Sequence, residues 1–159
     1  MTTEQQVYPI YLTHLSQLLA IVIGGGAVGE RKVAGLLAAG ARVRLISPQA
    51  TTQLQAWAQA GQIEWLARAY QPGDLAEAFL VFAATNLRAI NAQVAADAAH
   101  LARLCNVADA PTEGAFHVPA VHRQAGLVIA VGSGGQSPRR TKQVREQIAK
   151  WLADDQSVT

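Results

Sequence analysis

Residues 18–29 read Leu-Leu-Ala-Ile-Val-Ile-Gly-Gly-Gly-Ala-Val-Gly, a short apolar run that ends in a cluster of glycines. The apolar part, Leu18–Ile23, is typical of a strand that is buried on both faces of a sheet. From Ala27 to Ala39 the apolar residues recur with helical spacing, and Gly40 is a natural end for that helix. The stretch therefore predicts a strand, a tight turn and a helix in direct succession.

The glycines of the turn match the pattern G-x-G-x-x-G at positions 24, 26 and 29. In such loops the first glycine permits the tight turn, and the second lets the backbone approach a pyrophosphate at the helix N-terminus. The third lets helix and strand pack closely. Glycines also mark ordinary turns, so the flanking strand and helix carry the argument. We expect a dinucleotide to bind at Gly24, Gly26, Ala27, Val28 and Gly29.

The alternation of strands and helices continues along the chain. Further strands are predicted at residues 41–46, 63–66, 80–84 and 104–107, and further helices at residues 51–59 and 90–101. Strands that alternate with helices through short connections form a mostly parallel sheet with helices on both faces. The predicted fold class is therefore α/β, with a Rossmann-like parallel sheet that binds the dinucleotide.

After Pro111 the pattern changes, because no helix separates the next two strand-like runs. The two runs are predicted as strands at residues 115–121 and 127–131, with a polar turn at residues 122–126 between them. An amphipathic helix is predicted at residues 139–152, followed by a polar, frayed tail at residues 153–159. Either Trp151 or Leu152 would face inward on that helix. We therefore expect an NAD-binding domain over residues 1–111 and a small hairpin-plus-helix segment over residues 112–159.

Composition limits the class of protein. The chain has 159 residues, of which half are hydrophobic and 15% are charged, enough apolar material for a domain with a buried core. No apolar run approaches the roughly 18–20 residues that span a membrane, and the start of the chain lacks the basic residues of a signal peptide. Cys105 is the single cysteine, and the four histidines are scattered without metal-ligand spacing. These features favour a cytoplasmic protein that binds neither a membrane nor a metal.

The position that would hold the cofactor's ribose is occupied by an unusual residue. An acid normally follows the second strand, but the chain has no acid between residues 31 and 63. Ser47 stands in that place and could hydrogen-bond a ribose. Arg44 lies nearby and would suit a 2′-phosphate, so the residues fit NAD and NADP alike.

Other polar residues follow the later strands, at the edge where ligands sit in open α/β sheets. Thr85 and Asn86 come directly after the strand 80–84, although both residue types also cap helices well. Asn106 lies at the end of the last predicted parallel strand, and Asp109 follows it in an Asp-Ala-Pro turn. We expect Thr85, Asn86 and Asn106 to lie on the cofactor side of the crevice.

Several short blocks of sequence occur in a characteristic order. They are Tyr8–Leu12, Gly29–Lys32, Asn106–Pro111, Ala115–Ala120 and Gly132–Pro138. Together they resemble the precorrin-2 dehydrogenase family, which includes the N-terminal half of bacterial sirohaem synthase and its stand-alone relatives. The resemblance covers about residues 7–153, nearly the whole chain.

The resemblance implies NAD-dependent oxidation of precorrin-2 to sirohydrochlorin, in sirohaem and cobalamin biosynthesis. It also implies a homodimer through the segment 112–159, a catalytic role for Asp109 and a place near the tetrapyrrole for Ser133. Some family members insert ferrous iron as well. Relatives commonly continue with a further helical domain, whereas this chain stops just after its last helix, so the segment is expected to be truncated relative to the family. The resemblance therefore implies dehydrogenation and leaves metal chelation open.

A tetrapyrrole with many carboxylates needs a cationic binding site. Arg139, Arg140 and Lys142 form a basic cluster at the start of the last predicted helix. There they oppose the helix dipole, so helix stability gives no reason for them. We expect this cluster to bind the tetrapyrrole together with Ser133 and His117.

Other functions are also compatible with these residues. Asp109 is the expected base for the substrate's proton, and His117 is its rival. A sensing module that binds NAD without catalysis is the main alternative, although such modules usually carry the ribose acid that this chain lacks. An NADP-dependent reductase with another substrate is a further alternative, motivated by Arg44. Nucleic-acid binding by the basic cluster is disfavoured, because no aromatic residues are interleaved with it.

Overall fold

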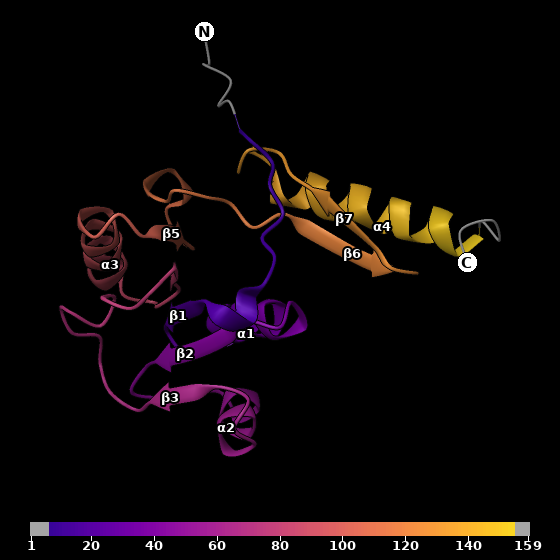
Figure 1. The fold of residues 1–159 in the computed structure, drawn as a ribbon. Coiled ribbons are helices and arrows are strands. Elements are labelled where there is room, and N and C mark those ends of the chain that lie inside the picture. The colour runs from indigo at the N-terminus through magenta and orange to yellow at the C-terminus, as the bar shows by residue number, and fades with distance from the viewer. Residues whose placement is uncertain (1–6, 155–159) are drawn as a thin grey trace, which may run out of the picture. The chain divides into compact units, whose positions relative to one another are not determined.

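The computed structural model describes residues 7–154, which form two compact units. The first unit comprises residues 10–116, and the second comprises residues 117–154 with residues 7–9 (Figure 1). None of the helices within the described range is long and apolar enough to cross a membrane.

The first unit is built on a parallel sheet with the strand order β3-β2-β1-β4-β5. Its strands are β1 (Leu19–Ile23), β2 (Arg42–Ile46), β3 (Glu64–Leu66), β4 (Leu80–Ala83) and β5 (Leu104–Val107). The chain passes from β1 to β2 and β3 on one side, and then returns to place β4 and β5 on the other side of β1. Ligands of open α/β sheets bind beyond the carboxyl ends of the strands at such a reversal, which here lies between β1 and β4.

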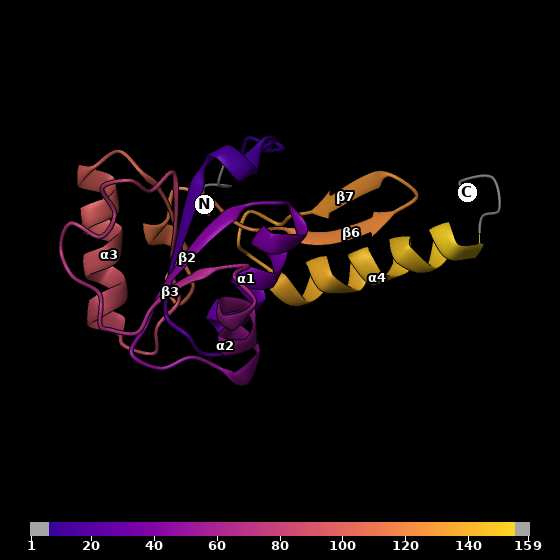
Figure 2. The ribbon, with the colours of Figure 1, turned by 60° about the horizontal axis from the view of Figure 1, so that its bottom comes forward.

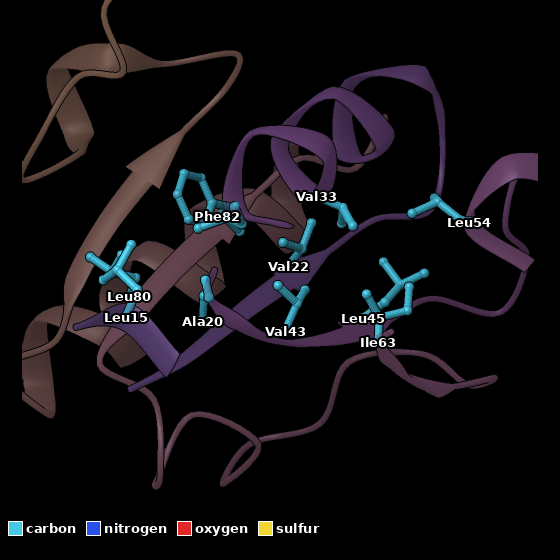
Figure 3. Packing of buried hydrophobic residues seen from close by; sticks show 12 residues of the cluster. Leu15, Ala20, Val22, Val33, Val43, Leu45, Leu54, Ile63, Leu80 and Phe82 are labelled. Carbon is cyan, nitrogen blue, oxygen red and sulfur yellow. The ribbon is translucent and has the colours of Figure 1, made fainter. Parts of the chain in front are cut away.

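Helices cover both faces of this sheet (Figure 2). The helices α1 (Ala27–Ala38) and α2 (Thr52–Gln59) lie on one face, and α3 (Arg88–His100) lies on the other. Side chains alternate along β1, so that Val22 packs in one core cluster with Val33 of α1, as Figure 3 shows. Ile21 packs in a second cluster with Val94 of α3. Every residue of β1 is buried, which explains why its sequence is an uninterrupted apolar run.

The predicted α/β class with a Rossmann-like sheet is confirmed, and its strands and helices begin and end within two residues of the predicted positions. The largest difference is at α3, which begins at Arg88 rather than at Ile90. The Leu87 carbonyl accepts hydrogen bonds from the N–H groups of Ile90 and Asn91, so the first turn starts earlier than the apolar pattern indicates.

The second unit contains an antiparallel hairpin and one helix. The hairpin is β6 (Ala120–Gln124) and β7 (Leu127–Val131), and the helix is α4 (Pro138–Asp154). The expected inward side chain on α4 is Leu152, which is buried, whereas Trp151 is 61% exposed. The predicted tail at 153–159 is wrong for Ala153 and Asp154, which are helical, and the other five residues lie outside the described part of the chain.

The predicted antiparallel hairpin is confirmed, and β7 has the predicted bounds, but the predicted bounds of the first strand (115–121) and of the polar turn (122–126) are wrong. The strand β6 begins five residues later, because the N–H of Ala115 donates to the Cys105 carbonyl and the start of this run belongs to the first unit. The reversal needs only Ala125 and Gly126, which have φ of 47° and 77°. Positive φ at both central residues is the geometry of a two-residue hairpin turn. The polar residues before it therefore belong to the strand.

Candidate functional site

The glycine loop after β1 is held against the ends of both neighbouring strands. Gly24 has φ of +117°, and a Cβ there would lie 2.4 Å from the carbonyl oxygen of Ala84 after β4. Its N–H donates to the carbonyl of Ile46, the last residue of β2, at 3.1 Å. A side chain at Gly24 is thus excluded both by the backbone conformation and by the neighbouring strand.

The other glycines of the loop divide into two kinds. A Cβ at Gly29 would lie 1.9 Å from the Gly24 carbonyl oxygen, and one at Gly25 would lie 2.1 Å from the Gln49 carbonyl oxygen. At these two positions the neighbouring backbone therefore leaves no room for a side chain. Around Gly26, in contrast, a Cβ would meet no described atom within 4 Å.

The open space at Gly26 lies at the N-terminus of α1. Gly26 is the N-cap residue of this helix, and its carbonyl accepts the N–H of Glu30 at 2.9 Å. The N–H groups of Ala27, Val28 and Gly29 belong to the first turn, which has no intrahelical acceptors for them. Unpaired N–H groups, the helix dipole and the absence of a side chain together suit a pyrophosphate. The residues of the loop thus fit a dinucleotide.

Ser47 follows β2 as expected, but its hydroxyl has a partner within the protein. Its side chain is buried, and the Oγ accepts the N–H of Gly25 at 3.0 Å. Its carbonyl accepts the indole N–H of Trp65 at 2.9 Å. Ser47 therefore holds the glycine loop in place, a contribution that the sequence did not predict.

Arg44 is engaged by two carboxylates. It lies within β2, its Nε donates to Glu64 at 2.7 Å and its Nη1 donates to Glu77 at 3.3 Å. The hydrogen bond to Glu64 is the main cause that raises the pKa of Arg44. A guanidinium that is already paired twice is a poor site for a 2′-phosphate, so the structure removes the motive for the NADP-dependent alternative.

The segment after β4 is ordered by Thr85. Its Oγ1 accepts the N–H of Leu87 at 3.1 Å and donates to the side-chain oxygen of Asn91 at 2.7 Å. Asn86 is exposed between them. Neither Thr85 nor Asn86 is the N-cap residue of α3, because that position is Leu87. Thr85 instead forms a local turn before the helix.

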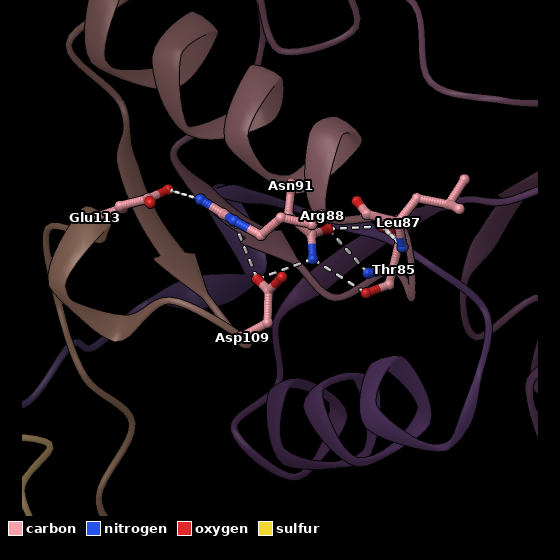
Figure 4. Close-up of polar contacts among 6 residues, drawn as sticks. All are labelled: Thr85, Leu87, Arg88, Asn91, Asp109 and Glu113. Atoms are coloured by element: carbon pink, nitrogen blue, oxygen red, sulfur yellow. Dashed lines mark hydrogen bonds and ion pairs between the residues drawn. The ribbon is translucent and has the colours of Figure 1, made fainter.

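Asp109 lies just beyond β5, and its side chain is 37% exposed. As Figure 4 shows, its Oδ1 accepts hydrogen bonds from Asn91 Nδ2 at 3.0 Å and from Arg88 Nη1 at 3.3 Å. Arg88 also pairs with Glu113, and this hydrogen bond is the main cause that raises the pKa of Arg88. The carboxylate is therefore fixed by one buried amide and one guanidinium.

The sequence prediction missed both Arg88 and Asn91. A signal for Asn91 was present, because it shares the inward face of α3 with Val94 and Ala98, where it is fully buried. A buried polar side chain needs hydrogen-bond partners, which is a reason to look for a network around it. Arg88 gave no such signal, since it is exposed at the start of the helix.

Asn106 is buried near the end of β5, the strand whose carboxyl end lies at the expected cofactor edge of the sheet. Its Nδ2 donates to the Phe116 carbonyl at 2.9 Å, while its Oδ1 has no hydrogen-bond partner among the described residues. Phe116 contacts Phe82 edge to face, and the ammonium of Lys32 lies 5.8 Å from the centre of the Phe82 ring. Burial, with a smaller contribution from Arg31, lowers the pKa of Lys32.

The predicted tetrapyrrole ligands belong to the second unit. Ser133 Oγ accepts the N–H of Ser137 at 2.9 Å, which closes the loop before α4. His117 lies against the same loop, since a Cβ at Gly135 would be 3.1 Å from its ring. Arg139, Arg140 and Lys142 are exposed on the first turns of α4, and Lys142 lies 3.9 Å from Glu146. Substrate binding by these residues stays a prediction.

Over residues 7–154, no group of three or more histidine, cysteine, aspartate or glutamate side chains could hold a metal ion. Cys105 is buried in the core of the first unit, and its burial raises the pKa of the thiol to about 11.

Known proteins match most of the chain. The NAD(P)-binding family NAD_binding_7 matches residues 12–120. Siroheme synthase 1 of Aeromonas salmonicida is 38% identical over 132 residues, and Siroheme synthase 1 of Serratia proteamaculans is 39% identical over 144 residues. These matches cover 83% and 91% of this chain, but only 28% and 30% of the two relatives. The chain thus spans less than a third of the length of these relatives.

A solved structure is similar over nearly the whole fold. The structure of "SirC, precorrin-2 dehydrogenase" superimposes with a TM-score of 0.80 and 27% sequence identity. The match covers 91% of this chain and 70% of that protein. The fold of this chain therefore has a counterpart in a protein of known structure.

Proposed function

This chain belongs to the NAD(P)-binding family NAD_binding_7, and on that premise we propose that it oxidises precorrin-2 to sirohydrochlorin with NAD as the hydride acceptor. The observation that carries the proposal is the open space at Gly26, at the same edge of the sheet as Asp109. The siroheme synthase relatives and the precorrin-2 dehydrogenase structure supply the substrate class.

The reaction removes a hydride and a proton from the macrocycle. When bound, NAD accepts the hydride with both electrons. Asp109 accepts the proton, since it is the carboxylate that follows β5 at the ligand edge of the sheet and its side chain is partly exposed. The proton then leaves to solvent. The products are sirohydrochlorin, NADH and one proton.

NAD is favoured over NADP by the charges around the end of β2. The segment 47–51, Ser-Pro-Gln-Ala-Thr, contains no cation, and Arg44 is paired with Glu64 and Glu77. A 2′-phosphate would therefore find no free positive charge in this segment. This proposal places the protein in the cytoplasm, where NAD is available.

The second unit supplies the substrate contacts in this proposal. Arg139, Arg140 and Lys142 would pair with carboxylates of precorrin-2, and Ser133 and His117 would complete the contacts. The hairpin and α4 would form a homodimer, since apolar side chains such as Leu127 and Trp151 are exposed there. The cofactor would be bound by residues 1–111, and residues 112–159 would serve the substrate and the dimer.

The test is turnover of enzymatically generated precorrin-2 under anaerobic conditions. NADH formation and the sirohydrochlorin spectrum should rise together with NAD, while the Asp109→Ala protein should bind NAD and lose turnover. Asp97→Asn, near the C-terminal end of α3, keeps a side-chain oxygen for the Tyr70 hydroxyl and is a control aspartate change that should leave the rate unchanged. NAD binding without any turnover in the wild type would favour a sensing module instead. Wild-type rates in Asp109→Ala would remove this residue from the mechanism.

A further inference from the structure

Asn91 connects the two segments that flank the candidate site. It is 0% exposed on the inward face of α3, where the neighbouring inward residues are apolar. Its Oδ1 accepts the N–H of Thr85 at 3.1 Å and the hydroxyl of Thr85 at 2.7 Å. Its Nδ2 donates to the Thr85 carbonyl and to Asp109 Oδ1, both at 3.0 Å. All the hydrogen-bonding capacity of this amide is therefore used.

The hydrogen bonds at Asp109 are asymmetric. Both donors, Asn91 Nδ2 and Arg88 Nη1, converge on Oδ1. No described residue donates to Oδ2. Arg88 is itself held on its far side by Glu113, so the guanidinium cannot readily turn from one carboxylate oxygen to the other (Figure 4).

We infer that Asn91 is a positioning residue, which with Arg88 anchors Asp109 through Oδ1 and leaves Oδ2 as the oxygen that accepts the substrate's proton. This inference rests on the proposed function, in which Asp109 is the base. A carboxylate that is fixed through one oxygen presents the other in a constant direction, as proton transfer requires. The same amide links Asp109 to the segment after β4 through hydrogen bonds, so the position of the carboxylate depends on the position of that segment.

The sharpest test replaces the amide by a carboxylate of the same shape. In Asn91→Asp the new side chain can donate to Asp109 only while it carries a proton. Two carboxylates about 3 Å apart titrate as a coupled pair, and at high pH both are ionised and repel each other. We expect kcat to fall at least tenfold above the second pKa of the pair, whereas wild-type kcat stays level. The affinity for NAD should stay within about threefold of wild type.

A matched control and a second variant make the test decisive. Gln93→Glu also converts an amide to a carboxylate on α3, but at an exposed position, and it should leave the pH profile unchanged. Arg88→Gln removes the other donor to Oδ1 at the surface, where folding is at little risk. It should lower kcat severalfold without changing the affinity for NAD. Circular dichroism at each pH reports whether each variant is folded, and Arg88→Gln carries the test if Asn91→Asp is not.

The outcomes separate this inference from the proposed function. If Asp109→Asn still turns over precorrin-2, the base has been assigned wrongly and the proposed function fails at that step. If Asp109→Asn is inactive but the folded Asn91→Asp and Arg88→Gln proteins keep wild-type kcat and its pH profile, the positioning role is refuted. A loss of NAD affinity with unchanged kcat would also refute it, because the amide would then serve the cofactor segment alone.

Discussion

Two glycines of the same loop should respond to alanine in opposite ways. A Cβ at Gly29 would lie 1.9 Å from the Gly24 carbonyl oxygen, while ordinary contact begins at 3.4 Å. The α1 helix would have to move by about 1.5 Å, and overpacking of this kind costs about 1–3 kcal/mol. The clashing atom is a backbone oxygen, so the upper end of this range applies, and the restriction of the unfolded chain by alanine offsets only about 0.4–1 kcal/mol of it. Since 1 kcal/mol shifts the melting temperature of a unit this size by about 4–8 °C, Gly29→Ala should still melt at least about 4 °C lower.

Gly26→Ala should leave the stability almost unchanged. Its φ of −84° is open to alanine, and a Cβ there meets no described atom within 4 Å. Alanine is a poorer N-cap than glycine by roughly 0.5–1 kcal/mol, but it restricts the unfolded chain by a similar roughly 0.4–1 kcal/mol. The two effects offset each other. The new methyl group instead fills the space proposed for the pyrophosphate, so NAD should bind at least about tenfold more weakly, a loss of about 1.4 kcal/mol.

Thermal unfolding by circular dichroism and NAD titration by calorimetry measure the two effects separately. The reasoning requires Gly26→Ala to be stable and weak in NAD binding, and Gly29→Ala to be unstable. Wild-type NAD affinity in Gly26→Ala would refute the placement of the pyrophosphate. An unchanged melting temperature in Gly29→Ala would refute the packing argument.

Three further predictions concern the surroundings of the loop and the core. Ser47→Ala leaves the buried N–H of Gly25 without an acceptor, so the free energy of unfolding should fall by about 1–3 kcal/mol in denaturant titrations; no change would mean that water replaces the hydroxyl. Gln49→Arg adds a cation after β2 and should raise NADP affinity about tenfold in calorimetric titrations, with NAD affinity unchanged. Burial raises the pKa of Cys105 to about 11, while the exposed thiol of the unfolded chain ionises near about 8.5. Stability should therefore fall between these two pH values, and Cys105→Ala should lose this part of the slope in melting curves.

The fold could be predicted from local pattern because each element carries its own signal. The apolar run of β1, the glycines after it and the helical spacing of α1 are adjacent in sequence, and the later strands repeat the alternation. The first hairpin strand and the turn, in contrast, differ from the prediction because the local pattern is misleading there. The polar residues His122–Gln124 look like a turn, but the reversal is decided by positive φ at Ala125 and Gly126, which composition does not reveal.

The candidate site was predicted only in part because its contacts join distant residues. The Ser47 hydroxyl meets the Gly25 N–H across 22 residues, and Asn91 meets Asp109 across 18. Such contacts depend on which strands become neighbours, and β4 is placed between β1 and β5 only by the chain reversal. A residue type can suggest a ligand, as Arg44 suggested a 2′-phosphate. Only the neighbouring carboxylates of Glu64 and Glu77 show that it is already paired.

The difference in affinity between NAD and NADP should be modest in this protein. Many NAD-binding loops carry an acid after β2, which binds the ribose hydroxyls of NAD. Such an acid would also repel a 2′-phosphate. Here Ser47 stands in that place and its hydroxyl is directed to Gly25, so no charged side chain in the segment 47–51 repels the phosphate and none attracts it. Discrimination then rests on the lack of a partner for the phosphate rather than on repulsion. A single cation, as in Gln49→Arg, should for that reason be enough to bring NADP close to NAD in affinity.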